Sequence, residues 1–512
     1  MNYQRKTLLL ILIATIARMI VAIAVELGND EVYYRLYAEH LQWNYFDHPP
    51  MVGWLIRFTT LNLFVDTGLT IRLGAILCSA ATTWLLYKCG ERLSNAYAGF
   101  LAALLYTATI YGSIIAGTFI LPDSPQMVCW AAALLLLIKI TESKTITKKC
   151  SRDILWFGVV TGLGMLCKIH TVFLWFGFGW YILLYRRHWL QHWAIYAAAI
   201  ITIIFFIPVI IWNIQNDFIT FLYHGKRVDV ASGGMDIESL LTFTGGQIFY
   251  CNPIVFFIII RAIWHRDLFV KPSHRRVLLL AALPLIFLAT AISLFKNLLP
   301  HWTGPAYAAL ILLTACYYSR KRRALLSKRQ VPLSFNIANG LLLLVVVSGI
   351  AVIHFFPGTL GEKKMEKKGD GDFTLDMYGW KNFSNSFDSI YHSTHNAGGK
   401  AIIVADKWFP AAHIDFYVAQ PLHIQTIALG PVDNIHQYHW LNKQRGLVTD
   451  STDIYIISPS NYLVEKENIS ALKNIVPNKI DTIIQYRNKL EARRFYVYYF
   501  KKDRYHFNPS DY

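Results

Sequence analysis

Long apolar segments separated by short polar segments fill the first 356 residues of this chain of 512. The apolar runs are roughly 17 to 22 residues long, which is the length a helix needs to cross a bilayer. We therefore predict eleven membrane-spanning helices. They cover residues 8–26, 69–87, 97–116, 125–140, 154–168, 170–185, 192–213, 243–260, 277–295, 300–318 and 335–356. The first run lacks a small-residue cleavage site before Glu26, so we interpret it as a retained helix.

The pattern changes after residue 356. A polar linker over 357–372 has no apolar period, and residues 373–512 have the pattern of a soluble α/β domain. Strand-like runs cover 401–405, 453–458 and 495–500, and helices are expected near 381–393 and 461–475. The fold class is thus a polytopic α-helical membrane domain over 1–356, whose first outer loop is 27–68, followed by an α/β domain.

The chain has a net charge of +17, and the distribution of its basic residues predicts the orientation in the membrane. Lysines and arginines gather in alternate loops, above all in the run 320–329, which is the bias of cytoplasmic loops. The amino terminus and these loops are therefore expected inside a multi-pass cell (inner or plasma) membrane, and the α/β domain outside. The lysine and arginine side chains are therefore expected to contact anionic membrane lipids and not nucleic acid. The seven cysteines have no spacing typical of a metal cluster or a disulfide framework.

The polar residues that carry candidate chemistry fall on the predicted outer side. Asp30 and Glu31 follow the first span, and either could deprotonate an acceptor hydroxyl, hold a metal or cap a helix. Asp47-His48 precedes two prolines, which hold the backbone rigid. That pair is suited to a metal, a phosphate or a sugar hydroxyl, or it is a plain turn.

Three further outer segments complete the set. Asp123 lies in a tight turn between two spans, as a second acid or a helix cap. His224, Lys226 and Arg227 lie in a long outer loop, where cations are suited to phosphate. Two more pairs either reach a phosphate or mark the membrane edge: Lys168 with His170, and Lys296 with His301.

These positions favour an enzyme that takes a lipid-borne substrate at the outer face. No nucleotide-binding loop is present in a convincing context. A donor that is already attached to a lipid therefore fits better than a nucleotide sugar. The alternative is a transporter or flippase of lipid-linked sugars, which predicts polar residues through the membrane core and related half-sequences. A ligand sensor would need an inner signalling domain.

Four motifs match a known family. They are Gly28-Asn-Asp-Glu-Val-Tyr-Tyr, Tyr45-Phe-Asp-His-Pro-Pro-Met-Val-Gly-Trp, Pro122-Asp-Ser-Pro and Pro300-His-Trp-Thr-Gly-Pro-Ala-Tyr. Over about the first 320 residues the chain resembles the bacterial membrane glycosyltransferases of the GT-C fold. These are grouped with the dolichyl-phosphate-mannose protein mannosyltransferases and the aminoarabinose transferase of lipid A.

The resemblance implies transfer of a sugar from a polyprenyl-phosphate carrier to a lipid, glycan or protein acceptor on the outer face, with inversion. It assigns Asp30 as the base or acceptor-orienting group and Asp123 as the second acid. The aminoarabinose group has an acid-lysine pair before its double proline, where this chain has Asp47-His48. A divalent metal, zinc, is implied at Asp47 and His224. The donor phosphate is expected at His48, Lys226 and Arg227.

Overall fold

The chain divides into two compact units in a computed structural model. Unit 1 comprises residues 1–22 and 41–346, and unit 2 comprises residues 23–40 and 347–512. The structure describes residues 2–502 except 231–233, 266–269, 325–330, 395–399, 446–451, 465–468 and 470–474. The segment 23–40 thus groups with the carboxyl-terminal part, a division that differs from the sequence-based boundaries at 356 and 373.

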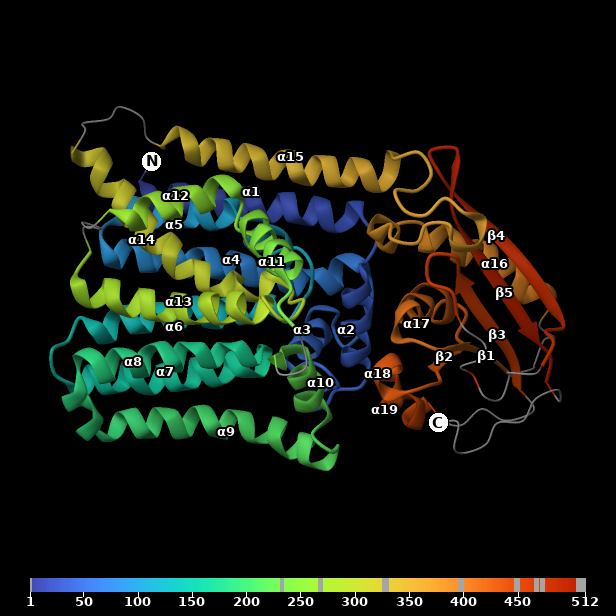
Figure 1. Cartoon of the computed structure of the whole chain (residues 1–512), viewed down its shortest axis with the longest axis horizontal. Coiled ribbons are helices and arrows are strands. Elements are labelled where there is room, and N and C mark those ends of the chain that lie inside the picture. Colours follow the sequence, from blue (N-terminus) through green and yellow to red (C-terminus); the bar gives the residue numbers. More distant parts are fainter. Residues whose placement is uncertain are drawn as a thin grey trace. The chain divides into compact units, whose positions relative to one another are not determined.

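Unit 1 is a bundle of helices (Figure 1). Its helices, of which α1 and α15 run on into unit 2, are α1 (Tyr3–Ala24), α3 (Met51–Thr59), α4 (Gly68–Leu93), α5 (Ala96–Ala108), α6 (Asp123–Thr141), α7 (Lys148–Cys167), α8 (Phe173–Tyr185), α9 (Trp193–Gln215), α10 (Ile219–Val228), α11 (Ile237–Tyr250), α12 (Pro253–Trp264), α13 (Pro272–Ser293), α14 (Gly304–Ala324) and α15 (Leu333–Phe355).

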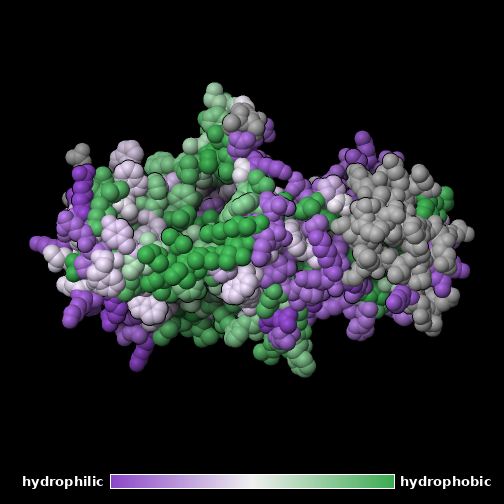
Figure 2. All heavy atoms as spheres, turned by 90° about the horizontal axis from the view of Figure 1, so that it is seen from below, coloured by the Kyte–Doolittle hydropathy of each residue, from purple (hydrophilic) through white to green (hydrophobic). Residues whose placement is uncertain are grey.

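The predicted helical membrane fold is confirmed. Among the described residues, seven helices are long and apolar enough to cross a membrane: α1, α4, α6, α7, α9, α13 and α15. Each coincides with a predicted segment. Their outer faces are hydrophobic, as Figure 2 shows for one side of unit 1, and Phe257, Phe287 and Leu343 are each more than 60% exposed. Such side chains are stable in contact with lipid.

The remaining four predicted spans differ from simple crossings. The segment 243–260 is a pair of helices, α11 and α12, bent by 93°. The bend occurs at Asn252, whose φ of 68° and position before Pro253 end the first helix. The side-chain amide of Asn252 donates to the carbonyl oxygens of Ala108 and Ala338, both at 2.9 Å. The helix α5 is shorter than the predicted span 97–116. The helical stretch Ile169–Tyr185, which includes α8, covers the predicted span 170–185 but is shorter than the seven long helices, and α14 is not among the seven.

Unit 2 contains a five-stranded sheet in the order β2-β1-β3-β5-β4 (Figure 1). Its elements are α2 (Asn29–Glu39), α16 (Trp380–Thr394), β1 (Lys400–Ala405), α17 (Trp408–Ile414), β2 (Gln425–Ala428), α18 (Val432–Ile435), α19 (Tyr438–Arg445), β3 (Thr452–Pro459), β4 (Lys479–Arg487) and β5 (Leu490–Phe500). β1 pairs in parallel with β2 and β3, and β5 pairs antiparallel with β3 and β4.

The three predicted strands and the helix near 381–393 are confirmed as β1, β3, β5 and α16. The helix predicted at 461–475 falls mostly outside the described residues. α16 packs on the sheet through Phe383, whose ring stacks on Phe495 with centroids 3.9 Å apart. The predicted linker is held by a fully buried ion pair of Asp372 with Arg487 at 2.8 Å, so it is an integral part of unit 2.

Candidate active site

Asp123 is the buried acid of unit 1. It is the first residue of α6 and only 2% exposed. Its Oδ2 accepts a hydrogen bond from Lys168 Nζ at 2.8 Å, and its Oδ1 accepts one from the Tyr111 hydroxyl at 2.9 Å. Lys168 is 4% exposed and lies where α7 ends. A buried carboxylate needs such partners, because an unpaired charge in a low-dielectric region is costly. Asp123 is therefore a fixed, charge-paired group.

Tyr111 reaches Asp123 because α5 ends early. The helix stops at Ala108, and a π-helical turn follows over Tyr111–Ile115. Arg18 of α1 supports this turn, since its guanidinium donates to the Ser113 hydroxyl at 3.1 Å. Gly304 allows a close approach on the other side, because an added Cβ there would lie 2.3 Å from the Tyr111 ring. Turns of this kind inside a helix often occur at functional sites.

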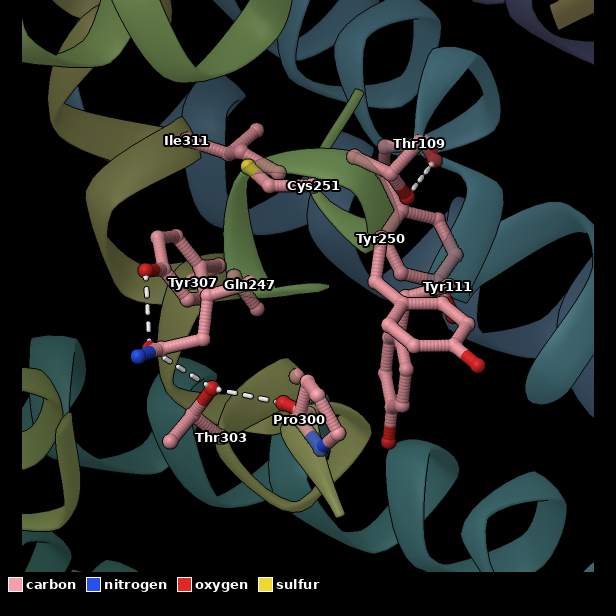
Figure 3. A pocket seen from close by; sticks show the side chains of 12 residues that line it. Thr109, Tyr111, Gln247, Tyr250, Cys251, Pro300, Thr303, Tyr307 and Ile311 are labelled. Carbon is pink, nitrogen blue, oxygen red and sulfur yellow. Dashed lines mark hydrogen bonds between the residues drawn. The ribbon is translucent and has the colours of Figure 1, made fainter. Parts of the chain in front are cut away.

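Tyr111 also lines a narrow pocket in unit 1 (Figure 3). Tyr111 and Tyr250 form one side of it, while Gln247 on the other side accepts hydrogen bonds from Thr303 at 3.0 Å and Tyr307 at 3.1 Å. The lining is aromatic and polar without a charged side chain. Tyr111 therefore connects the pocket to Asp123, which is not itself part of the lining.

The Asp47-His48 turn is fastened to α10. Asn44 donates to the Thr220 hydroxyl at 2.8 Å, and that hydroxyl donates to the Tyr45 carbonyl oxygen at 3.0 Å. His224 of α10 approaches the turn through Nε2, which lies 2.6 Å from the Asp47 carbonyl oxygen. The rings of His48 and His224 have centroids 5.8 Å apart. This set of contacts joins two of the predicted outer segments.

Side chains from four separate stretches of unit 1 lie close to one another, and His48 adds a fifth because it interacts with His170 and Lys168. His170 is near enough to Lys168, His224, Asp123 and His301 to interact with each electrostatically. The His170 ring also lies 5.1 Å from the ring of Trp302, next to His301 in the sequence. The structure thus gathers most of the sequence-predicted groups of unit 1 near the Lys168–Asp123 ion pair, and the basic side chains outnumber the carboxylates.

The histidines of this cluster are held neutral. Burial, together with nearby His224, Lys168, His170 and Arg227, lowers the pKa of His48 well below its usual value. Burial is also the main reason for the lowered pKa of His224. A neutral imidazole donates one hydrogen bond without adding a second buried charge beside a lysine.

His301 provides a pH-dependent prediction. Burial, reinforced by Lys168, lowers its pKa from 6.5 to about 4. The unfolded chain therefore binds a proton at this residue between pH 6.5 and 4 while the folded chain does not, so stability falls as the pH falls through that range. We expect His301→Gln to reduce the loss of thermal stability between pH 7 and pH 5, measured in detergent. The exposed His188 is the matched control, and an equal effect of His188→Gln would contradict the assignment.

Asp30 lies in unit 2, on the first turn of α2. The helix is capped by Gly28, and Glu31 accepts a hydrogen bond from the Gly28 amide at 2.9 Å. Glu31 is 2% exposed, whereas Asp30 is exposed. Of the three roles considered for this acidic pair, the structure assigns the helix cap to Glu31. Asp30 lies on the solvent-exposed side of the same turn.

The predicted phosphate and metal ligands have different surroundings. Lys226 and Arg227 are exposed at the end of α10, and the Arg227 guanidinium lies 4.4 Å from the Tyr223 ring centroid. Among the described residues, no three His, Cys, Asp or Glu side chains are grouped as a metal site. Asp47 and His224 supply two donors, and one His224 nitrogen already faces a carbonyl oxygen. The zinc site stays a prediction.

Tyr111 was not predicted from the sequence, because a tyrosine inside the apolar run 97–116 gives no separate signal. Lys168 was recognised as a candidate for phosphate contact, but its pairing with Asp123 was not. The two residues are 45 positions apart, and only the packing of α6 against α7 brings them together.

The chain is similar in sequence to known proteins. Residues 47–212 match the family described as dolichyl-phosphate-mannose-protein mannosyltransferase. The chain is 22% identical to the lipid A galacturonosyltransferase RgtD of Rhizobium johnstonii over 479 residues, which is 93% of this chain and 95% of the relative.

Solved structures show the same fold. The crystal structure of ArnT from Cupriavidus metallidurans bound to undecaprenyl phosphate has a TM-score of 0.61 at 14% identity, and the similarity covers 96% of this chain and 97% of that chain. The apo structure of the same protein gives a TM-score of 0.60. These findings confirm the resemblance that the four motifs predicted: this chain is a polytopic membrane protein with the fold of the GT-C glycosyltransferases.

Proposed function

We propose that this chain is a glycosyltransferase that moves a sugar from a polyprenyl-phosphate carrier to an acceptor at the extracytoplasmic face of the cell (inner or plasma) membrane. The observation that carries the proposal is the buried ion pair of Lys168 with Asp123 in an apolar helical bundle. His170 and His301 lie near Asp123, and His48 and His224 lie near Lys168. Such a cluster is suited to a phosphate whose lipid chain stays in the bilayer. The similarity to RgtD and ArnT supports the same reaction class.

The reaction is an inverting displacement. The acceptor hydroxyl oxygen forms a bond to the anomeric carbon, and the bond from that carbon to the carrier phosphate oxygen breaks. The electron pair leaves with the polyprenyl phosphate, which gains one negative charge. Asp30 accepts the hydroxyl proton as the general base. If the acceptor is a phosphate, no proton has to be removed, and Asp30 positions the acceptor.

The charge that develops on the leaving phosphate is stabilised by lysine and arginine cations and by a hydrogen bond from the neutral imidazole of His48. Lys226, Arg227 and His48 bind the donor phosphate, and Lys168 adds a buried positive charge to the same region. Fixed donors of this kind lower the barrier because they require no reorganisation during the reaction. Asp123 holds Lys168 in place and orients the sugar or the acceptor, with Tyr111 as its second partner.

The relative named lipid A galacturonosyltransferase makes lipid A the first acceptor to test, followed by other glycolipids and proteins. The alternative function, transport of lipid-linked sugars, has no support from these relatives. The test is an assay with purified protein and radiolabelled polyprenyl-phosphate sugars, with lipid and protein acceptors tested in parallel. We expect label to move to an acceptor and free polyprenyl phosphate to form in equal amount. Movement of intact labelled donor across vesicle membranes without transfer would contradict the proposal.

A further inference from the structure

The short segment between α1 and α2, residues 26–29, is bonded through Glu26, Leu27 and Asn29 to the carboxyl-terminal part of unit 2. The backbone amides of Trp380 and Lys381 donate to the Glu26 carboxylate at 2.8 and 3.1 Å. The Leu27 amide donates to the Tyr417 hydroxyl at 2.8 Å. The Asn29 side-chain amide donates to Asp376 Oδ2 at 2.9 Å. The segment is thereby fixed by residues more than 340 positions away in the chain.

The groups that hold this segment are themselves firmly placed. His413 is fully buried, and its Nε2 lies 3.1 Å from the Leu27 carbonyl oxygen and 2.9 Å from that of Asp376. The His413 ring packs on Trp380 with centroids 4.5 Å apart. One imidazole thus joins both sides of the contact, so the segment and the loop at Asp376 cannot shift independently without losing a buried hydrogen bond.

The segment ends at the residue next to the proposed base. Asn29 is the first residue of α2 and Asp30 is the second, so a change in the Asn29 position moves the Asp30 backbone with it. A helix of 11 residues is marginal by itself in water, and its start is defined by the contacts of its first turn. The direction of the exposed Asp30 carboxylate therefore depends on the bonds made by residues 26–29.

We propose that the carboxyl-terminal domain is a positioning element for catalysis, in which Asp376, His413 and Tyr417 fix residues 26–29 and so orient Asp30. This inference rests on the proposed function, since it assumes that Asp30 takes part in transfer. Asp376, His413 and Tyr417 are positioning residues and contact no substrate. A displacement of about 1 Å at a reacting group can lower a rate about 100-fold, so loss of one such bond is expected to act on kcat.

The test compares variants that remove one bond each. Asn29→Ala removes the bond to Asp376, and Tyr417→Phe removes only the hydroxyl that accepts from Leu27 while keeping the ring. We expect each to lower kcat by about 10- to 100-fold with the KM for the donor changed less than threefold. Asp376→Asn keeps an oxygen that can accept from Asn29 and should retain most of the wild-type kcat. The double variant Asn29→Ala/Asp376→Ala should have nearly the same kcat as Asn29→Ala alone, because both changes remove the same hydrogen bond and their effects do not add.

Tyr455→Phe is the matched control, because the Tyr455 hydroxyl makes a hydrogen bond of the same kind in unit 2, to the Thr394 hydroxyl at 2.7 Å, and neither residue bonds to residues 26–29 in the contacts described above. We expect its kcat to equal that of the wild type. Wild-type kcat in Asn29→Ala and Tyr417→Phe, or an equal loss in Tyr455→Phe, would overturn the inference. Asp30→Asn is measured in the same preparations. If Asp30→Asn is active, the proposed function fails. If it is inactive while Asn29→Ala and Tyr417→Phe are fully active, only the positioning role fails.

Discussion

Replacement of Asp30 by asparagine is expected to lower the rate of sugar transfer by about 100- to 10,000-fold, the range typical for loss of a general base. The amide has nearly the shape of the carboxylate but cannot accept the acceptor proton. The cap of α2 is made by Gly28 and Glu31, so the helix should form as before. Transfer is measured with radiolabelled donor under saturating conditions, and membrane insertion by fractionation and gel filtration.

The matched control for this change is Asp388→Asn. Asp388 is an exposed acid on α16 of the same unit, and we expect the variant to keep the wild-type rate. Glu31→Gln is a second comparison, and it should affect stability more than Asp30→Asn does because Glu31 is buried at the helix cap. A well-folded Asp30→Asn protein with the wild-type rate would count against the assignment of Asp30 as the base.

Replacement of Lys168 by methionine is expected to have the largest effect on stability. The change leaves the Asp123 carboxylate buried with a single hydroxyl partner, Tyr111. Breaking one side of a buried ion pair costs about 3–5 kcal/mol, because the remaining charge is uncompensated. Transfer should also fall at least 10-fold, since the buried cation near the phosphate is lost. The thermal midpoint in detergent and the rate of transfer give the two effects separately.

The double variant Asp123→Asn/Lys168→Met distinguishes the loss of stability caused by an unpaired buried charge from the loss of transfer caused by the missing side chains. Both charges are removed, so we expect thermal stability to return close to the wild-type value while transfer stays low. Arg92→Gln is the control for an exposed pair, that of Arg92 with Glu142, and should change stability by less than about 1 kcal/mol. Full stability of the single Lys168→Met variant would show that the ion pair does not hold Asp123.

Much of the helical fold can be predicted from the hydropathy pattern, because an apolar run of sufficient length has few alternatives in a membrane. The pattern does not reveal where a run is interrupted. Asn252-Pro253 lies inside the apolar segment 243–260, and a local backbone turn with φ of 68° divides it into two helices. Similarly, nothing local indicates that residues 23–40 pack with the carboxyl-terminal domain, because the bonds involved join residues several hundred positions apart.

The candidate site was predictable where the chemistry is local in the sequence. Asp47-His48 and His224 are recognisable from polar residues at the membrane edge, and the structure places their segments in contact. The partners of Asp123 are a different case. Lys168 and Tyr111 come from separate helices, and their roles depend on the packing of α6 with α7 and on the π-helical turn after α5. Such three-dimensional pairings leave no pattern in a single sequence.

The central claim is that the basic cluster around Asp123 holds the phosphate of a lipid-linked sugar. The most direct test is a cryo-electron microscopy map of the wild-type protein in lipid nanodiscs with polyprenyl phosphate added. We predict phosphate density within hydrogen-bonding distance of His48 or Lys168, with the prenyl chain running along the helices of unit 1. Well-resolved phosphate density on another part of the protein, with this cluster empty, would contradict the account.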